Sequence, residues 1–353
     1  MRKLLFVILI ILPALVRGQD FLSGKVIDSQ THEPLSYATV YLNGTTKGTI
    51  TDSLGCFEIR NVKFPTTVVI SFVGYKTQVH ELSRYPGGMM IELKQADNLP
   101  EVIVTAKGER EQIMAYFKSM FLGDDRWGRH AVIRNPDALM FNLSPDQRTL
   151  KAWANEPLII DLPLLGYELY VNLIDFNVER YDGSAACDIL GYFFFRPYGS
   201  DRLTQRHQKN RLAVYYDSNQ HFLRSLYQNR LAENGYVLMA ADAASFQFED
   251  VIKYEVIDAS LYTDSIPGDM MRIHDLSDKR LKILFYHKLD GSPLDLTRNK
   301  KLLHPFSKSG MHLLLDTCTF HKDGIVTDNS IRFTGDMSQK RIGASLPDDF
   351  TVN

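Results

Sequence analysis

The sequence predicts a mainly β protein, in which an N-terminal antiparallel β-sandwich is followed by an α+β domain. Residues 21–95 hold short strand-like runs divided by turn residues, with no helical period between them, and this pattern is typical of a sandwich. From residue 109 onward, apolar side chains at helical spacing alternate with further strand-like runs, and this mixture indicates the α+β domain.

The N-terminal strands are marked by alternation and by the turns between them. In residues 38–42, apolar and polar side chains alternate, with Val40 and Leu42 on one side of the expected strand and Tyr41 on the other. Asn43-Gly44 then supplies a turn at which a positive φ costs little. The remaining strands are expected at residues 21–27, 56–59, 68–73 and 91–93, with another turn at 52–55.

The second region is expected to begin with a helix over residues 109–121, which Gly123 ends. Residues 202–234 form its strongest helical stretch, which breaks near residues 217–219, where Asp217 and Gln220 are suited to a capping box. The apolar stripe of the second helix consists of Phe222, Leu223, Leu226, Tyr227 and Leu231. Strands are expected at residues 139–143, 150–154, 167–178, 189–195 and 313–320, the last joined by a hairpin to 325–327.

The first 19 residues have the features of a secretory signal peptide. Arg2 and Lys3 precede an apolar run over residues 4–16, and small and polar residues follow it. A membrane-spanning helix needs roughly 20 apolar residues, whereas this run is shorter and contains Pro13. No cysteine lies near the expected cleavage point after Gln19, which argues against a lipid anchor. The sequence therefore predicts export to the periplasm or the outer membrane, with membrane attachment only through a partner.

Composition excludes several classes of function. Lys and Arg number 40 against 42 Asp and Glu, and a formal net charge of −2 gives no electrostatic reason to expect nucleic acid. The three cysteines, Cys56, Cys187 and Cys318, are too widely spaced for a disulfide framework or a metal site. Three buried thiols are the simpler interpretation, and a single bridge between Cys187 and Cys318 stays open.

Several short motifs follow one another at characteristic spacings in the first region. They are Gly24-Lys25-Val26-Ile27-Asp28, Glu33-Pro34-Leu35, Ala38-Thr39-Val40, Gly48-Thr49-Ile50-Thr51-Asp52, Gly55-Cys56-Phe57 and Ile70-Ser71-Phe72-Val73-Gly74-Tyr75. This series resembles the carboxypeptidase regulatory-like domain, whose fold is a transthyretin-like sandwich. The resemblance implies an accessory module and carries over no catalytic residue.

Domains of this kind commonly form the periplasmic N-terminus of TonB-dependent outer-membrane transporters. Residues 99–106 resemble the segment that ends the domain there, and Val102, Ile103 and Val104 are similar to the strand that an energising partner captures. An ordinary domain-closing strand is the favoured interpretation, and capture by a partner is the alternative. A 22-stranded transporter needs about 220 residues in strands alone, more than residues 107–353 offer beside their helices.

The second region resembles the C-terminal part of other exported proteins that carry this N-terminal domain. The similar stretches are Arg211-Leu212-Ala213-Val214-Tyr215-Tyr216, His221-Phe222-Leu223-Arg224-Ser225-Leu226, Gly235-Tyr236, Arg341-Ile342-Gly343 and Leu346-Pro347-Asp348-Asp349-Phe350. No activity follows from this resemblance, so it predicts architecture and compartment only.

The sequence contains no motif for metallopeptidase chemistry. A zinc carboxypeptidase needs His-x-x-Glu to place two ligands on one ion, and none of the 10 histidines has Glu three residues later. The nearest approach, His287-Lys288-Leu289-Asp290, leads into an Asp-Gly turn and is better explained as a hairpin. Because dispersed catalytic residues leave no local spacing, a hydrolase acting on envelope peptide or glycan stays as the alternative.

Two clusters are candidate ligand sites. Arg202, Arg206 and Lys209 fall at helical spacing, so a helix would place three cations on one face, suited to a carboxylate, phosphate or anionic sugar. A solvated helix face is the favoured interpretation. The aromatic run at residues 192–195 could stack sugar rings, but in a strand Phe194 faces away from its neighbours, so burial on both faces is favoured.

Together these observations predict a signal peptide at 1–19, the β-sandwich at 20–98, a strand and linker at 99–108, and the α+β domain at 109–353. The predicted function is that of a non-catalytic exported envelope protein, which binds a ligand or serves as a scaffold. No cofactor, metal or nucleic acid is expected, and an envelope protein is the expected kind of partner. A hydrolase or a small outer-membrane transport component is the alternative.

We expect the mature protein to begin at Asp20 and to fractionate with the periplasm or the outer membrane, because the apolar run is too short to stay as an anchor. N-terminal sequencing of the protein from fractionated native cells measures both properties. An intact Met1 in the cytoplasmic fraction would contradict the export prediction.

Overall fold

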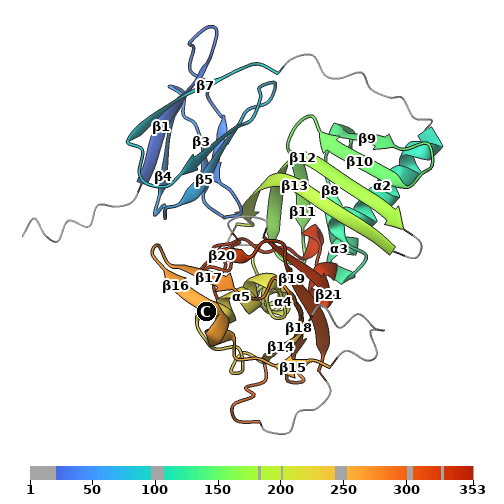
Figure 1. The fold of residues 1–353 in the computed structure, drawn as a ribbon. Helices are drawn as coiled ribbons and strands as arrows, with labels where there is room; N and C mark the ends of the chain where they lie inside the picture. Colours follow the sequence, from blue (N-terminus) through green and yellow to red (C-terminus); the bar gives the residue numbers. More distant parts are fainter. Residues whose placement is uncertain are drawn as a thin grey trace, which may run out of the picture.

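The computed structural model describes residues 21–96, 107–181, 184–199, 202–242, 253–299, 305–326 and 330–352. The predicted signal peptide and residues 97–106, which include Val102, Ile103 and Val104, lie outside the described residues. Strands make up 44% and helices 18% of the structure, which confirms the predicted mainly β class. Figure 1 shows three units that follow one another along the chain, in blue, in green and in yellow to red.

The first unit is a sandwich of two sheets, with strand orders β4-β1-β7 and β3-β2-β5-β6. Its strands are β1 (Phe21–Asp28), β2 (Thr39–Leu42), β3 (Gly48–Ile50), β4 (Cys56–Arg60), β5 (Thr66–Ser71), β6 (Gln78–Leu82) and β7 (Gly88–Leu93). Val40 and Leu42 point into the core between the sheets, as the alternation predicts, and Tyr41 lies on the opposite face of its sheet. β3 and β6 are additional strands that the sequence pattern did not reveal.

The second unit is a six-stranded antiparallel sheet with the order β8-β11-β12-β10-β9, to which β13 adds by pairing with β12. Its elements are α2 (Lys107–Leu122), α3 (Arg126–His130), β8 (Val132–Ile133), η2 (Pro136–Ala138), β9 (Leu139–Leu143), β10 (Thr149–Ala154), β11 (Leu158–Leu162), β12 (Tyr167–Tyr181) and β13 (Ser184–Pro197). α2 packs Phe117 and Phe121 against Phe141 and Phe176 of the sheet, and these rings form the centre of the core.

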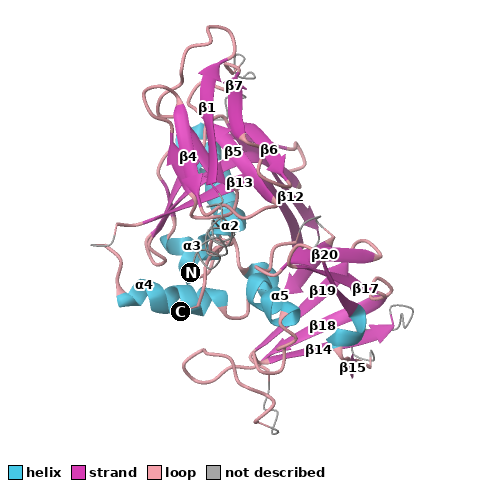
Figure 2. Cartoon of the chain, turned by 90° about the vertical axis from the view of Figure 1, so that its left-hand side faces the viewer, coloured by secondary structure: helices cyan, strands magenta, loops and turns pink. Residues whose placement is uncertain are grey.

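The third unit packs α5 against two sheets, with strand orders β15-β14-β18-β19-β21 and β16-β17-β20 (Figure 2). Its helices are α5 (Asn219–Tyr227), η4 (Ala259–Tyr262) and η5 (Asp336–Gln339). The flanking helices α4 (Gln205–Tyr215) and η6 (Ile342–Ala344) pack Val214 and Ala344 into the core of the second unit instead. Its strands are β14 (Tyr236–Asp242), β15 (Glu255–Val256), β16 (Thr263–Ile266), β17 (Met270–His274), β18 (Lys279–Phe285), β19 (Ser307–Leu313), β20 (Thr317–His321) and β21 (Ile331–Gly335). In the part of the chain that the structure describes, every helix is too short or too polar to span a bilayer.

The structure corrects several details of the sequence prediction. The region after the sandwich contains two hydrophobic cores, one around α2 and one around α5. α2 begins at Lys107, inside the stretch expected as a linker. The helical stretch at 202–234 is two short helices, and Ser218, not Asp217, caps α5 by accepting a hydrogen bond from the His221 N–H. The strand expected at 313–320 is interrupted between β19 and β20.

Two glycines of the sandwich provide a matched test of its turns. Gly55 has φ +75°, and a Cβ there would lie 2.5 Å from the carbonyl oxygen of Val26. Gly74 has φ +83°, with nothing within 4 Å of such a Cβ. We expect Gly74→Ala to cost about 1 kcal/mol for the left-handed backbone alone. Gly55→Ala should cost about 3 kcal/mol, because β1 must also move.

Urea denaturation of the full chain measures both costs, since the m-value shows whether the unfolding remains comparable. Equal losses of stability in the two variants would contradict the close approach of the Gly55 turn to β1.

Candidate functional site

The turn between β2 and β3 meets the second unit through its backbone. The Gly44 N–H donates to the carbonyl oxygen of Phe193 at 2.8 Å, and the Phe195 N–H donates to the carbonyl oxygen of Thr45 at 3.0 Å. Thr45 and Phe194 thereby form a parallel bridge. Asn43 adds a side-chain contact, because its Oδ1 accepts from the Phe193 N–H at 2.8 Å. The turn thus pairs with the side of β13 that faces away from β12.

Side chains of the same two units pack beside this bridge. Tyr41 stacks on Phe194 with 5.2 Å between ring centroids, and Val69 and Tyr170 join them. The Asn172 amide hydrogen-bonds the Tyr41 hydroxyl. Phe193 and Phe195 point the other way, into the core of the second unit. The predicted burial of the aromatic run on both faces is therefore confirmed, and Phe194 serves an interface between units.

The C-terminal tail of the chain binds the same turn from the third unit. The Asp348 N–H donates to the carbonyl oxygen of Gly44 at 2.7 Å. The Asp349 carboxylate accepts from the Thr46 N–H at 3.1 Å and from the Thr46 hydroxyl at 2.7 Å. Asp348 Oδ2 lies only 2.0 Å from where a Cβ on Gly44 would stand, and Gly44 has φ +75°, so a side chain there would strain the turn and displace the Asp348 carboxylate. All three units therefore meet at residues 43–46.

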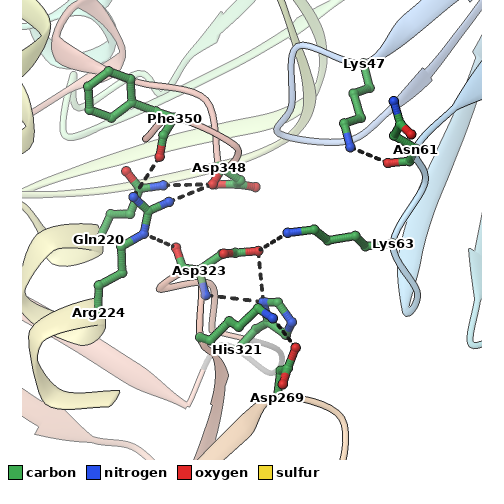
Figure 3. Close-up of polar contacts among 11 residues, drawn as sticks. Lys47, Asn61, Lys63, Gln220, Arg224, Asp269, His321, Asp323, Asp348 and Phe350 are labelled. Carbon is green, nitrogen blue, oxygen red and sulfur yellow. Dashed lines mark hydrogen bonds and ion pairs between the residues drawn. The ribbon is translucent and has the colours of Figure 1, made fainter. Parts of the chain in front are cut away.

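Arg224 on α5 fixes the tail and a neighbouring turn (Figure 3). Its Nε donates to the carbonyl oxygen of Asp323 at 2.8 Å, its Nη1 to that of Phe350 at 2.7 Å and its Nη2 to that of Asp348 at 2.8 Å. Gln220, one turn earlier on α5, reaches the carbonyl oxygen of Asp348 at 3.3 Å. A single guanidinium thus joins α5, the tail and the turn after β20, in the fork geometry that arginine presents.

A cleft of about 1300 Å³ opens at this junction. Its walls come from sandwich loops, from α5, from the turn after β20 and from the tail. Lys63 reaches across it to Asp323 at 3.9 Å, and His321 contacts the same carboxylate at 3.3 Å (Figure 3). The charged lining is nearly balanced, with Lys47, Lys63, Arg224, Lys288 and Lys322 against Glu81, Glu233, Asp295, Asp323, Asp348 and Asp349.

Two groups in the cleft wall have shifted pKa values. Burial, reinforced by the charge of Asp349, raises the pKa of Asp348 to about 7. Burial also lowers the pKa of His221 to about 3, with smaller contributions from Lys340 and Arg224. The His221 imidazole is therefore neutral at physiological pH, and its Nδ1 accepts a hydrogen bond from the Tyr236 hydroxyl at 2.8 Å.

The metal and disulfide hypotheses can be compared with the same structure. Among the described residues, no group of three or more His, Cys, Asp or Glu side chains is arranged to hold a metal ion. Asp290 binds the Ser292 hydroxyl, while the His287 ring packs on Phe306, so the two do not converge. Cys187 and Cys318 lie in different cores, so the bridge between them does not form. Cys56 is exposed and Cys187 half-buried, so the expectation of three buried thiols is wrong.

The three candidate cations, Arg202, Arg206 and Lys209, do not share one helix. α4 begins at Gln205 with Thr204 as its N-cap, so Arg202 precedes the helix and stacks on Tyr198 at 4.4 Å. Arg206 and Lys209 are exposed on α4. The cleft, as far as the described residues define it, includes none of these three cations. The N-cap signal of Thr204 could have shown that the helix starts too late to include Arg202.

Other residues of the junction were overlooked by motif reasoning. Arg224, His221 and Asp348 belong to no motif with a characteristic spacing, so the sequence assigned them no role. The Asn43-Gly44 dipeptide gave a turn signal that is confirmed by the positive φ of Gly44, but not the partners of that turn. Arg224, Asp348 and the Asn43-Gly44 turn have in common that their partners lie far away along the sequence.

Comparison with known proteins identifies the first unit. Residues 22–104 match the family model of the CarboxypepD_reg-like domain. This match confirms the resemblance seen in the first region, and it covers less than half of the chain. The CarboxypepD_reg-like domain is a generic, non-catalytic β-sandwich. No curated protein matches the chain.

Three solved structures share limited similarity with the chain. Two are interface mutants of a type II cohesin–X-dockerin complex from Acetivibrio cellulolyticus, each 24% identical with a TM-score of 0.19, covering 30% and 29% of this chain and 78% and 74% of theirs. The third is a suspected membrane-associated protein of unknown function from Bacteroides fragilis, 10% identical with a TM-score of 0.18, covering 51% of this chain and 98% of its own. At these TM-scores the likenesses carry no argument about fold or function.

The raised pKa of Asp348 predicts a pH-dependent stability. Between about pH 4 and pH 7 the Asp348 carboxyl keeps its proton in the folded protein, whereas in the unfolded chain, with a pKa of 3.8, it has already released the proton. The unfolded chain is therefore favoured more and more as the pH rises, and the folded protein loses stability over this range. Asp348→Asn removes the ionisable group. Relative to wild type, we expect the variant to gain on the order of 2 kcal/mol between pH 5 and pH 8.

Urea unfolding of both proteins at a fixed ionic strength measures this difference. Parallel pH profiles for wild type and Asp348→Asn would show that the carboxyl is not held in its protonated form.

Proposed function

We propose that this chain is a non-catalytic exported envelope protein that binds a ligand in the cleft between its sandwich, α5 and the C-terminal tail. The cleft is the observation that carries the proposal, since concave sites between structural units are where proteins usually bind small ligands. Its volume of about 1300 Å³ is sufficient for a ligand of several sugar or amino-acid units.

The hydrogen-bond partners of the polar groups in the cleft support ligand binding over catalysis. Arg224 donates three of its five N–H groups to backbone carbonyls, so its guanidinium serves chiefly to hold the tail and the turn after β20 in place. His321 lies against Asp323, but within the described residues no hydroxyl or thiol hydrogen-bonds it, as a nucleophile–base pair requires. The first unit belongs to a kind of domain that is not catalytic.

Export and scaffolding are the remaining parts of the proposal. The apolar run at 4–16 supports export. The likeness of residues 99–106 to the strand that ends the N-terminal domain of TonB-dependent transporters supports an envelope protein as partner. The three units are joined at one turn by backbone and side-chain hydrogen bonds, an arrangement suited to present a ligand or a partner.

A matched pair of substitutions tests the cleft. Ser83 is an exposed loop residue that lines the cleft, whereas Ser53 is an exposed loop residue of the same sandwich outside it. We expect Ser83→Trp to fill part of the cleft and Ser53→Trp to leave it open. Each protein is incubated with envelope extract, reisolated, and its co-purifying molecules are identified by mass spectrometry.

Wild type and Ser53→Trp should retain the same molecule, chemically intact, and Ser83→Trp should retain at least tenfold less of it. Equal retention by both variants would place binding outside the cleft. If the protein instead cleaves the molecule, and produces more cleaved product each time fresh extract is added, the hydrolase alternative is favoured.

A further inference from the structure

His221 occupies an unusual position for a cleft residue. It lies in the first turn of α5, only 4% exposed, and is nevertheless part of the cleft wall. Aromatic rings surround the imidazole, with centroid distances of 4.9 Å to Tyr215, 5.4 Å to Tyr216 and 5.1 Å to Tyr236. A histidine that serves only as packing is ordinarily satisfied at both ring nitrogens.

The hydrogen bonds of this ring define its tautomer. Nδ1 accepts from the fully buried Tyr236 hydroxyl at 2.8 Å and lies 3.3 Å from the Asp217 N–H, which also donates to it. With Nδ1 as the acceptor in a neutral imidazole, the proton resides on Nε2. None of the described residues hydrogen-bonds Nε2. The ring therefore offers one fixed N–H donor to whatever enters the cleft.

Tyr216 provides an apolar surface next to this donor. Its ring meets the imidazole edge to face and is half-buried, so one part of it faces the cleft. Lys288 and Ser292, on the turn after β18, add polar groups to the same cleft lining. An aromatic ring beside a neutral donor suits a ligand that has both a weakly polar face and an acceptor oxygen.

The remaining lining decides between classes of ligand. Since its cations and acids are nearly balanced, a polyanion would gain little from the cleft electrostatically. The lining combines carboxylates, amides, hydroxyls and ammonium groups, which together can accept and donate many hydrogen bonds. A sugar hydroxyl both donates and accepts, so a carbohydrate uses such a lining more fully than a peptide with one donor and one acceptor per residue.

We propose that His221 and Tyr216 form a subsite for a neutral carbohydrate, in which the His221 Nε2–H donates to a sugar oxygen and the Tyr216 ring packs on the sugar face. This inference rests on the proposed function, because it names the ligand of the same cleft. Tyr236 acts as a positioning residue, since its hydroxyl holds the imidazole in the Nε2–H tautomer.

Calorimetric titration of the full mature chain with neutral hexasaccharides of glucose, xylose and mannose tests the proposal. An acidic galacturonate hexamer and an uncharged hexapeptide are the comparison probes. We expect at least one neutral hexasaccharide to bind and neither comparison probe to do so. His221→Phe and Tyr216→Ala should each weaken binding at least tenfold, while Tyr181→Ala, an exposed tyrosine at the end of β12, should leave it unchanged.

A spectroscopic measurement keeps the proposal testable if His221→Phe unfolds. In protein labelled with ¹⁵N-histidine, the His221 resonance should show the proton on Nε2 and should shift when the sugar saturates. A proton on Nδ1, or an Nε2 signal that the bound sugar leaves unchanged, would overturn the subsite.

The outcomes also separate this inference from the proposed function. If the hexapeptide or the galacturonate binds instead, and Ser83→Trp abolishes that binding, the cleft is a binding site and the carbohydrate inference fails. If a neutral hexasaccharide binds wild type, Ser83→Trp and His221→Phe equally, its site lies elsewhere and both proposals fail.

Discussion

The backbone pairing between the β2–β3 turn and β13 is the contact on which the arrangement of the three units depends. A sheet edge has unpaired N–H and C=O groups, and an unpaired group that becomes buried costs about as much as a lost hydrogen bond. Here Gly44 and Thr45 pair with the Phe193 carbonyl and the Phe195 N–H on the edge of β13, and the Asp348 N–H donates to the carbonyl of Gly44. The same few residues therefore cover part of the edge of the second unit's sheet and also bind the C-terminal tail.

This pairing also limits how far the units can move apart. Separating the sandwich from β13 would break two backbone hydrogen bonds and expose Tyr41, which is 1% exposed, together with its stack on Phe194. Each hydrogen bond contributes about 1 kcal/mol, and burial of an aromatic side chain a few kcal/mol more. The walls of the cleft are consequently held in place by packing outside the cleft, and the polar groups that line it need not hold the units together.

The interactions that the charged side chains already make decide which of them can contact a ligand in the cleft. Asp349 and Arg224 are committed to Thr46 and to backbone carbonyls, so they stabilise the junction itself. Lys63 and Asp323 form a solvated pair, which contributes little to stability and is easily exchanged for contacts with a ligand. His221 differs from both, because its neutral ring is fixed by Tyr236 and still has a donor to offer. A fixed donor and a cleft of defined shape are what ligand binding requires.

The sequence by itself determined much of the local structure of this protein: five strands of the sandwich (β1, β2, β4, β5 and β7), the Asn43-Gly44 turn, the α2 helix and the family of the first unit. These features depend on the spacing of apolar side chains, on turn-forming residues and on short motifs, all of which are properties of residues close together in the sequence. Only the tertiary structure decided that Gly44 meets Phe193 and Asp348, that Arg224 joins three segments, and that two cores follow the sandwich. The reason is physical. These contacts join residues 99 or more positions apart, and their energy comes largely from burial and from backbone groups that every residue has. No residue pattern along the chain therefore specifies them.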